Sequence, residues 1–419
     1  MGAAHAWMHL VVLVALSVPL ALPSLALAAP TSVDSRVNIL SAQELLHGNP
    51  HNLVNQRRQR MADVHMEYTR TLSLVGTILQ IFALLLFWRS GRAARLRDAL
   101  RRRIRSPALV RFLFGMACAA IVQFVSFPVL ELERRVFVGF GISSLTFDAW
   151  WRERVVSFVC TMLLAGAATT LVVALVERVR LWYVFLAVIL FSAIAASTVL
   201  GPLFSSDRTA SVILPPSIVL PVAKIERGTG FCSDAPLLRW EIADRTAIAR
   251  AKTDGFGATA RILLGSRLLD SAPTDEVAYV AARESARCAN GDGMRTALFS
   301  TFVLVLAILG AVLVADRIPF RFDDDALARL TLVAALIGVF QLALAPLDAA
   351  YDRRLIARAD AVAIATSHDP ASAVRDFVRI ADEQFVPLCP SQPERLFFYH
   401  MPPLGTRIAA ATGRPDPCH

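Results

Sequence analysis

Six long apolar stretches constrain the fold of this chain more than any other feature. They lie at Leu72–Trp88, Phe112–Leu130, Val155–Val176, Leu181–Phe204, Thr296–Ala315 and Leu330–Leu347. None contains Asp, Glu, Lys or Arg, and each is about long enough to cross a roughly 30 Å hydrocarbon core. Because 55% of the 419 residues are hydrophobic, the sequence predicts a polytopic α-helical membrane protein with the lipid bilayer as its first partner.

A seventh apolar stretch, residues 1–29, precedes these six and fits two interpretations. Its length and the small-residue sequence Ala26-Leu27-Ala28 are typical of a cleaved signal peptide. The residues before its apolar core include no Lys or Arg, however, which favours an uncleaved first transmembrane helix. Both interpretations stay open at this point.

The arginines predict the topology. Residues 89–105 hold eight arginines and one aspartate directly after the first predicted span, so the positive-inside rule makes this loop cytoplasmic. Residues 71–204 then form a four-helix transmembrane region, and residues 30–70 are an extracytoplasmic segment expected to be a loose helix. The net charge of +9 is accounted for by this placement, so no nucleic-acid partner is expected.

The same topology predicts one soluble domain in two parts. Residues 205–295 and 348–419 flank a transmembrane hairpin at 296–347, so both parts emerge on the extracytoplasmic side. We expect a multi-pass protein of a bacterial inner membrane with this domain in the periplasm. Four cysteines fall in the domain, where thiols pair; two disulfides are predicted, in one of three connectivities. These are Cys232, Cys288, Cys389 and Cys418.

A motif resembling a metallopeptidase helix lies at Thr274–Asp292. Asp275 and Glu276 suit the first turn of a helix, and apolar residues recur behind them at helical spacing. The run Arg283-Glu284-Ser285-Ala286-Arg287 follows. With histidines for its two arginines it would read H-E-x-x-H, in which two imidazoles hold zinc and the glutamate acts as general base.

On these residues the chain resembles the CAAX prenyl protease 1 family, which are membrane-embedded zinc metallopeptidases. Four further blocks match in the same order along the chain. They are Gly141–Thr146 with Trp150, Gly255–Leu269, Arg353–Ala363 and Phe397–Ile408. Leu145 departs from the family, which has glutamine there. The resemblance implies a zincin-like α+β soluble domain split around the last transmembrane hairpin.

The resemblance also places the family's three zinc ligands on residues that cannot bind a metal. They fall on Arg283, Arg287 and Ile356. A guanidinium stays protonated and has no lone pair to donate, and isoleucine has no donor atom. Glu284 keeps the position of the general base as a vestige. We therefore expect no metal and no other cofactor.

Other family positions are kept unevenly. The second-shell aspartate falls on Asp360 and an arginine on Arg407, whereas the family histidine falls on Met401, with His400 displaced by one residue. The family's substrate-edge strand, against which a peptide lies, falls on four residues of one block. These are Gly255, Phe256, Gly257 and Thr259.

A physical account of the substitution follows. Without zinc, buried carboxylates at Glu284 and Asp360 would lack a counter-charge, which is costly. Arg283 and Arg287 are hypothesised to fill the metal's volume and pair with them. An alternative zinc site from Cys288, His368, His400 and His419 has no recognisable spacing.

The sequence thus favours a catalytically inactive membrane metallopeptidase homologue that retains binding of a peptide or lipidated peptide, or a regulatory role. One alternative is an active membrane metalloendopeptidase with unconventional ligands. The other is a transporter or channel, which the lack of ionisable residues in the spans disfavours.

Overall fold

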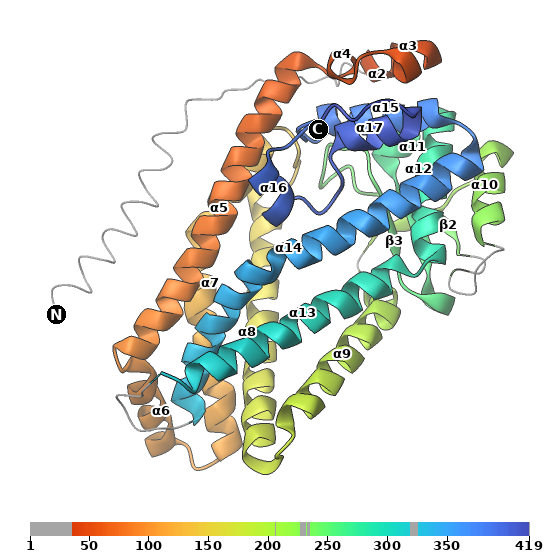
Figure 1. The fold of residues 1–419 in the computed structure, drawn as a ribbon. Helices are drawn as coiled ribbons and strands as arrows, with labels where there is room; N and C mark the ends of the chain where they lie inside the picture. Colours follow the sequence, from red (N-terminus) through yellow and green to blue (C-terminus); the bar gives the residue numbers. More distant parts are fainter. Residues whose placement is uncertain (1–35, 206, 227–231, 233–234, 319–325, 419) are drawn as a thin grey trace. The chain divides into compact units, whose positions relative to one another are not determined.

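The computed structural model describes residues 36–205, 207–226, 232, 235–318 and 326–418 (Figure 1). The predicted signal segment at residues 1–29 lies outside these residues. Within them, packing divides the chain into two compact units. The first described unit holds residues 67–182 and 311–339, and the second holds residues 36–66, 183–310 and 340–418.

Among the described residues, six helices are long and apolar enough to cross a membrane, and each overlaps one of the predicted spans. The polytopic helical fold class is therefore confirmed. The helices are α5 (Gln56–Arg89), α7 (Pro107–Gly139), α8 (Phe147–Arg178), α9 (Trp182–Phe204), α13 (Asp292–Ala315) and α14 (Ala326–Ser367). The last helix extends 20 residues beyond Leu347, the predicted end of its span, and carries chemistry discussed below.

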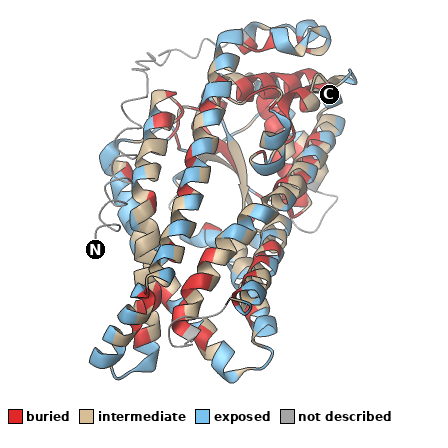
Figure 2. Ribbon diagram, turned by 60° about the vertical axis from the view of Figure 1, so that its left-hand side comes forward, coloured by how far each residue is buried: buried red, intermediate tan, exposed pale blue. Residues whose placement is uncertain are grey.

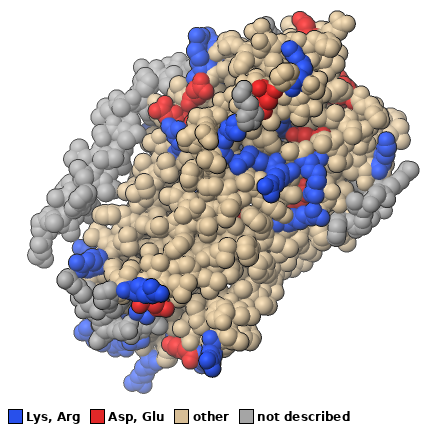
Figure 3. Space-filling model, in the orientation of Figure 1, with Lys and Arg blue, Asp and Glu red and all other residues tan. Residues whose placement is uncertain are grey.

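The connection predicted as a basic cytoplasmic loop at 89–105 contains a helix. Helix α6 (Arg92–Arg103) places Ala93 and Leu96 on an apolar cluster that includes Phe114. Its arginines point mainly outward, and Figure 3 shows Lys and Arg gathered over the α6 end of a largely uncharged surface. Helical spacing separates the two kinds of residue onto two faces, which the composition alone did not reveal.

The second unit contains a four-stranded sheet in the order β1-β2-β4-β3. Strands β2 and β4 are parallel, and β1 and β3 pair antiparallel with them on the outside. The bounds are β1 Thr209–Ser211, β2 Leu237–Trp240, β3 Ala251–Asp254 and β4 Arg261–Gly265. Since β4 is central and almost wholly buried, β3 is left as an edge strand.

Helices cover this sheet and form the core of the unit. Helix α12 (Thr274–Ala289) and helix α15 (Pro370–Glu383) are buried along most of their length. Figure 2 shows this as red ribbon gathered near the C-terminus, whereas the long helices are mainly tan and pale blue. The remaining helices are α10 (Pro216–Glu226), α11 (Ser266–Ser271), α16 (Gln392–Phe397) and α17 (Leu404–Thr412).

The segment before the first span packs into the same core, although a loose helix was predicted at 30–70. Leu45, Leu53 and Val54 are almost fully buried there. The bounds of its short helices are α2 Arg36–Ile39, α3 Ala42–His47 and α4 Pro50–Leu53. Mixed charge concealed this, because only a few apolar side chains in each short helix point inward.

The four residues predicted as a substrate-edge strand do not form one. Gly255 has φ +82°, and the short 3₁₀ helix η1 spans Gly257–Thr259. A Cβ at Gly255 would lie 2.2 Å from the Thr259 carbonyl oxygen, so only glycine fits this turn. The edge strand is the preceding β3. These four residues therefore lie in the connection between β3 and β4, which includes η1.

Two disulfides hold the second unit, joining Cys232 to Cys288 and Cys389 to Cys418. The first ties the end of α12 to the segment before β2. The second crosses Gly405, where a Cβ would meet the Cys418 sulfur at 2.6 Å. The fold therefore selects one of the three connectivities that the sequence left open, because it places these pairs of cysteines side by side.

Candidate functional site

Helix α12 places the motif residues at the heart of the second unit. Its Val277, Val280 and Ala281 face the core, which turns the Arg283-to-Arg287 run toward α15 and the end of α14. Gly291, with φ +65°, ends the segment after α12, whereas Gly293 already belongs to α13. The apolar periodicity of α12 therefore determines the direction of the motif.

Arg283 is the central positive charge of the site. Its Nη1 donates to Asp376 Oδ2 of α15 at 2.6 Å, and its Nε lies 3.4 Å from Glu284 Oε1. Its side chain is only 12% exposed. Burial opposes the charge, but Asp376 and Glu284 together raise the pKa of Arg283 well above its usual value. The guanidinium is thus held charged between two carboxylates.

Glu284, the predicted vestigial base, is 1% exposed and has every oxygen engaged. Arg287 Nη1 donates to its Oε2 at 3.0 Å, and the Thr253 hydroxyl lies 3.2 Å from the same oxygen. That hydroxyl also lies 2.8 Å from the Glu284 backbone oxygen. Both arginines at the H-E-x-x-H positions therefore pair with Glu284, as hypothesised from the sequence.

Asp360 has a different partner from the one hypothesised. It accepts from Arg407 at 2.8 and 2.9 Å in a two-pronged pair, and from the Tyr279 hydroxyl at 3.0 Å. Arg407 also lies over the Phe377 ring, 4.1 Å from its centroid. Burial disfavours its charge, but Asp360 raises the pKa of Arg407. This buried group is complete without Arg283 or Arg287.

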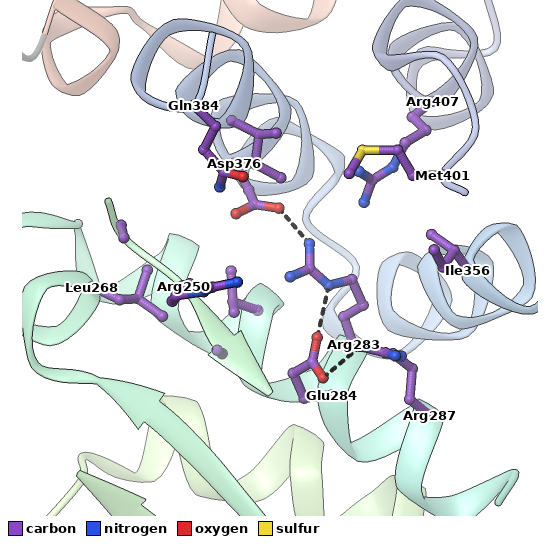
Figure 4. Close-up of a pocket in the computed structure, with 14 residues that line it drawn as sticks. Arg250, Leu268, Arg283, Glu284, Arg287, Ile356, Asp376, Gln384, Met401 and Arg407 are labelled. Atoms are coloured by element: carbon purple, nitrogen blue, oxygen red, sulfur yellow. Dashed lines mark hydrogen bonds and ion pairs between the residues drawn. The ribbon is translucent and has the colours of Figure 1, made fainter. Parts of the chain in front are cut away.

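One cavity of about 170 Å³ brings together Arg283, Arg287 and Ile356, the positions predicted to match the family's zinc ligands. We call it the motif cavity; Figure 4 shows its lining. Arg283 crosses its middle, with Ile356 and Met401 opposite and Asp376 above. The lining residues that carry charge or match family positions are Arg250, Arg283, Glu284, Arg287, Ile356, Asp376, Met401 and Arg407.

His400 does not join these residues. Its Nδ1 lies 2.8 Å from Asp352 Oδ2, and it lines a separate cavity of about 450 Å³ together with Asp348. The hydrogen bond with Asp352 raises the pKa of His400. A shift of one residue relative to the family motif has therefore placed Met401, not a histidine, at the motif cavity, so the second-shell prediction for His400 was wrong.

The motif cavity does not fit a zinc ion. Its two central side chains are guanidiniums without lone pairs, and Ile356 offers no donor. Cys288, one of the alternative ligands considered, is bonded to Cys232. Among the described residues, no group of three or more His, Cys, Asp and Glu side chains is placed to hold a metal. Three protein ligands are the usual minimum for a catalytic zinc.

Two charged residues that line this cavity were not predicted from the sequence. Asp376, the strongest partner of Arg283, lies 93 residues away on α15, and no spacing pattern connects them. Arg250 lies immediately before β3 and extends toward Arg283 in Figure 4. A search for charged residues flanking the resembling blocks would have found Arg250, because block residues begin five positions later.

Comparisons with known proteins found similarity to a family model and to a solved structure. Residues 233–415 match the model of Peptidase family M48. The crystal structure of S. mikatae Ste24p is similar, with a TM-score of 0.69 and 16% sequence identity. The similarity covers 90% of this chain and 94% of that chain. No curated protein matches the sequence.

Proposed function

We propose that this chain is a catalytically inactive, membrane-spanning homologue of the M48 metallopeptidases; the match of residues 233–415 to that family's model and the fold similarity to Ste24p support the relationship. The observation that carries the proposal is the position of Arg283. Its guanidinium occupies the middle of the motif cavity, bonded to Asp376 and beside Glu284. A fixed positive charge in that place repels a metal dication.

The proposal is supported by the state of Glu284. A general base must have an oxygen available to a water molecule. In this site Glu284 is buried and paired with Arg283, Arg287 and Thr253. The chain therefore lacks both the metal ligands and a free base. The function left to it is binding, and the exposed edge strand β3 offers backbone groups for an extended peptide.

We also propose an extracytoplasmic location for the second unit, in a bacterial inner membrane. The arginine-rich segment that begins after α5 supports a cytoplasmic position for that end of the helix. The two disulfides support an oxidising compartment for the second unit.

Native mass spectrometry of the full chain, purified without chelator, tests these points together. We expect the measured mass to show no bound zinc. It should also show that the four cysteines of the second unit are oxidised to two disulfides. The variant carrying Arg283→His, Arg287→His and Ile356→Glu should then take up about one zinc per chain, since it regains three donors. The matched control carries leucine at the same three positions and should take up none.

About one tightly bound zinc in the natural protein would overturn the inactive assignment and favour a metalloendopeptidase with other ligands. Free thiols at Cys232, Cys288, Cys389 and Cys418 in protein isolated under non-reducing conditions would overturn the extracytoplasmic placement. A triple variant that folds yet takes up no zinc would show that the scaffold around the motif cavity has itself changed.

A further inference from the structure

Helices α9, α13 and α14 enclose a second cavity, separate from the motif cavity, which we call the hairpin cavity. Its volume is about 450 Å³, and every residue that lines it belongs to the second unit. Apolar side chains of all three helices line it, among them Ile194, Leu304 and Ala345. Hydroxyl groups, the amide of Gln341 and the side chains of two titratable residues share the lining. The hairpin cavity is therefore amphipathic.

The charged groups lie at one end of the hairpin cavity, where the apolar runs of the helices end. Asp348 directly follows the run that ends at Leu347, and its Oδ1 accepts from the Ser300 hydroxyl of α13 at 3.0 Å. The lining of α14 extends back seven residues to Gln341, about 10 Å along the helix axis. A headgroup layer is about 5–7 Å thick on each side of a bilayer. The cavity thus begins at the depth of lipid headgroups and reaches the upper acyl chains.

Two opposite charges are presented at the headgroup end. Asp352 accepts from the Thr296 hydroxyl at 3.2 Å and lies 2.8 Å from His400 Nδ1. The bond to Asp352 raises the pKa of His400, which favours an imidazolium whose Nε2 has no partner among the described residues. Asp348 interacts electrostatically with His400, and Ser300 is its single hydrogen-bond donor in the part of the chain that the structure describes.

A carboxylate and an imidazolium at the end of an apolar cavity match a zwitterionic lipid headgroup. We propose that the hairpin cavity binds phosphatidylethanolamine, with the ammonium group on Asp348 and the phosphate on His400. A primary ammonium carries three N–H donors and forms short, charge-assisted hydrogen bonds to a carboxylate. The quaternary ammonium of phosphatidylcholine has no N–H donor. The apolar walls hold the first part of the acyl chains. This site is independent of the motif cavity and of its metal content.

Native mass spectrometry of the full chain, stripped of lipid and held in detergent micelles, tests the proposal. Phosphatidylethanolamine, phosphatidylcholine and phosphatidylglycerol with the same acyl chains are added singly at equal concentration. The first molecule of phosphatidylethanolamine should bind about tenfold more tightly than that of phosphatidylcholine, because only its ammonium group donates to Asp348. Phosphatidylglycerol has no cation, so it should also bind more weakly than phosphatidylethanolamine.

Two variants separate the two contacts. Asp348→Asn keeps the side-chain volume and an acceptor for Ser300 but removes the negative charge, so the ratio of the ethanolamine to the choline affinity should fall to about one. His400→Gln should weaken the binding of both lipids by the same factor and leave their ratio unchanged, since both lipids carry a phosphate.

Asp316→Asn is the matched control. Asp316 directly follows the other end of α13, belongs to the first unit and pairs with Arg329 at 3.1 Å. Its replacement is chemically the same as Asp348→Asn and should leave the ratio at the value of the natural protein. Thermal unfolding of each variant checks that it is folded, so that a lost ratio reflects the site.

Equal affinity for the ethanolamine and choline lipids in the natural protein would overturn the proposal, as would an unchanged ratio in Asp348→Asn. A preference for phosphatidylglycerol would identify an anion site and overturn it too. Soluble phosphoethanolamine should not displace the lipid at equal concentration; if it does, a free phosphate ester is the ligand and the lipid assignment is wrong. None of these results depends on the zinc content, which tests the proposed function separately.

Discussion

Two groups of charged residues lie around helices α12 and α15, and they carry an excess charge of opposite sign. One, the seam, consists of Glu276, Arg379 and Glu383, with one arginine for two acids. The other, the cavity cluster, consists of Arg250, Arg283, Glu284, Arg287 and Asp376, with three arginines for two acids. The seam has an excess negative charge and the cavity cluster an excess positive one.

The seam can meet its excess with a proton. Arg379 bonds to Glu276 at 2.5 and 2.9 Å and to Glu383 at 3.0 Å. Glu276 is fully buried, and burial raises its pKa to about 7 although Arg379 opposes the shift. The cavity cluster has no such route, because arginine keeps its proton. An excess acid is therefore compatible with a closed structural core, whereas the excess arginine, Arg250, lies exposed to water.

The largest expected effect is the loss of Arg379. Arg379→Met leaves Glu276 and Glu383 buried without their guanidinium partner, although Glu383 still accepts from the Ala249 backbone N–H, and should lower the free energy of unfolding by about 3 kcal/mol. Arg375→Met is the matched control on the same helix. Its partner, Asp275, has a side chain that is 45% exposed, so the loss should stay below about 1 kcal/mol. Denaturant unfolding measures both, and equal losses would mean that the seam is not a special structural group.

A second effect is the pH dependence of the seam. Because the folded-state pKa of Glu276 is raised from 4.5 to about 7, folding favours its protonated form. This contribution to stability is fully present below pH 4.5 and is lost as the pH rises through about 7. The thermal unfolding midpoint of the natural protein should therefore decrease as the pH is raised from 5 to 8.

Glu276→Gln keeps the volume of the side chain and removes this titration, so its midpoint should vary less over the same pH range. An identical pH dependence in the two proteins would assign the effect to other groups and would remove the proton from the comparison between the two clusters.

The smallest effect sharpens the comparison most. Since Arg250 gains no pair from the fold, Arg250→Met should change the free energy of unfolding by less than about 0.5 kcal/mol, or slightly stabilise the protein. A loss of more than about 2 kcal/mol, measured by denaturant unfolding, would show that Arg250 supports the fold and that the cavity cluster resembles the seam.

Much of the architecture was predictable because it depends on local pattern. The six spans follow from runs of about 20 apolar residues, and a bilayer leaves such runs no other stable conformation. Helix α12 was predicted at Thr274–Asp292 and lies at Thr274–Ala289, since its acids and apolar residues have helical spacing. The bipartite soluble domain followed from counting the spans.

The turn at Gly255 and the two-faced helix α6 were not foreseen from the sequence. Both depend on how a short segment meets its neighbours. In the turn, the left-handed conformation of Gly255 takes the chain out of β3. In α6, apolar residues dispersed among arginines form one face only once the helix packs on Phe114 and its neighbours. Composition does not report such contacts.

The sequence by itself determined that this chain is a membrane protein and that its motif positions hold arginine and isoleucine, because a guanidinium or an aliphatic side chain has the same lack of donor atoms in any fold. Only the tertiary structure decided how the resulting charges are met. Asp376 pairs with Arg283, and Asp360 pairs with Arg407. Arg250 has no ion-pair partner among the described residues. Pairing of buried charges depends on distances of about 3 Å between residues far apart in the chain, and folding alone sets those distances.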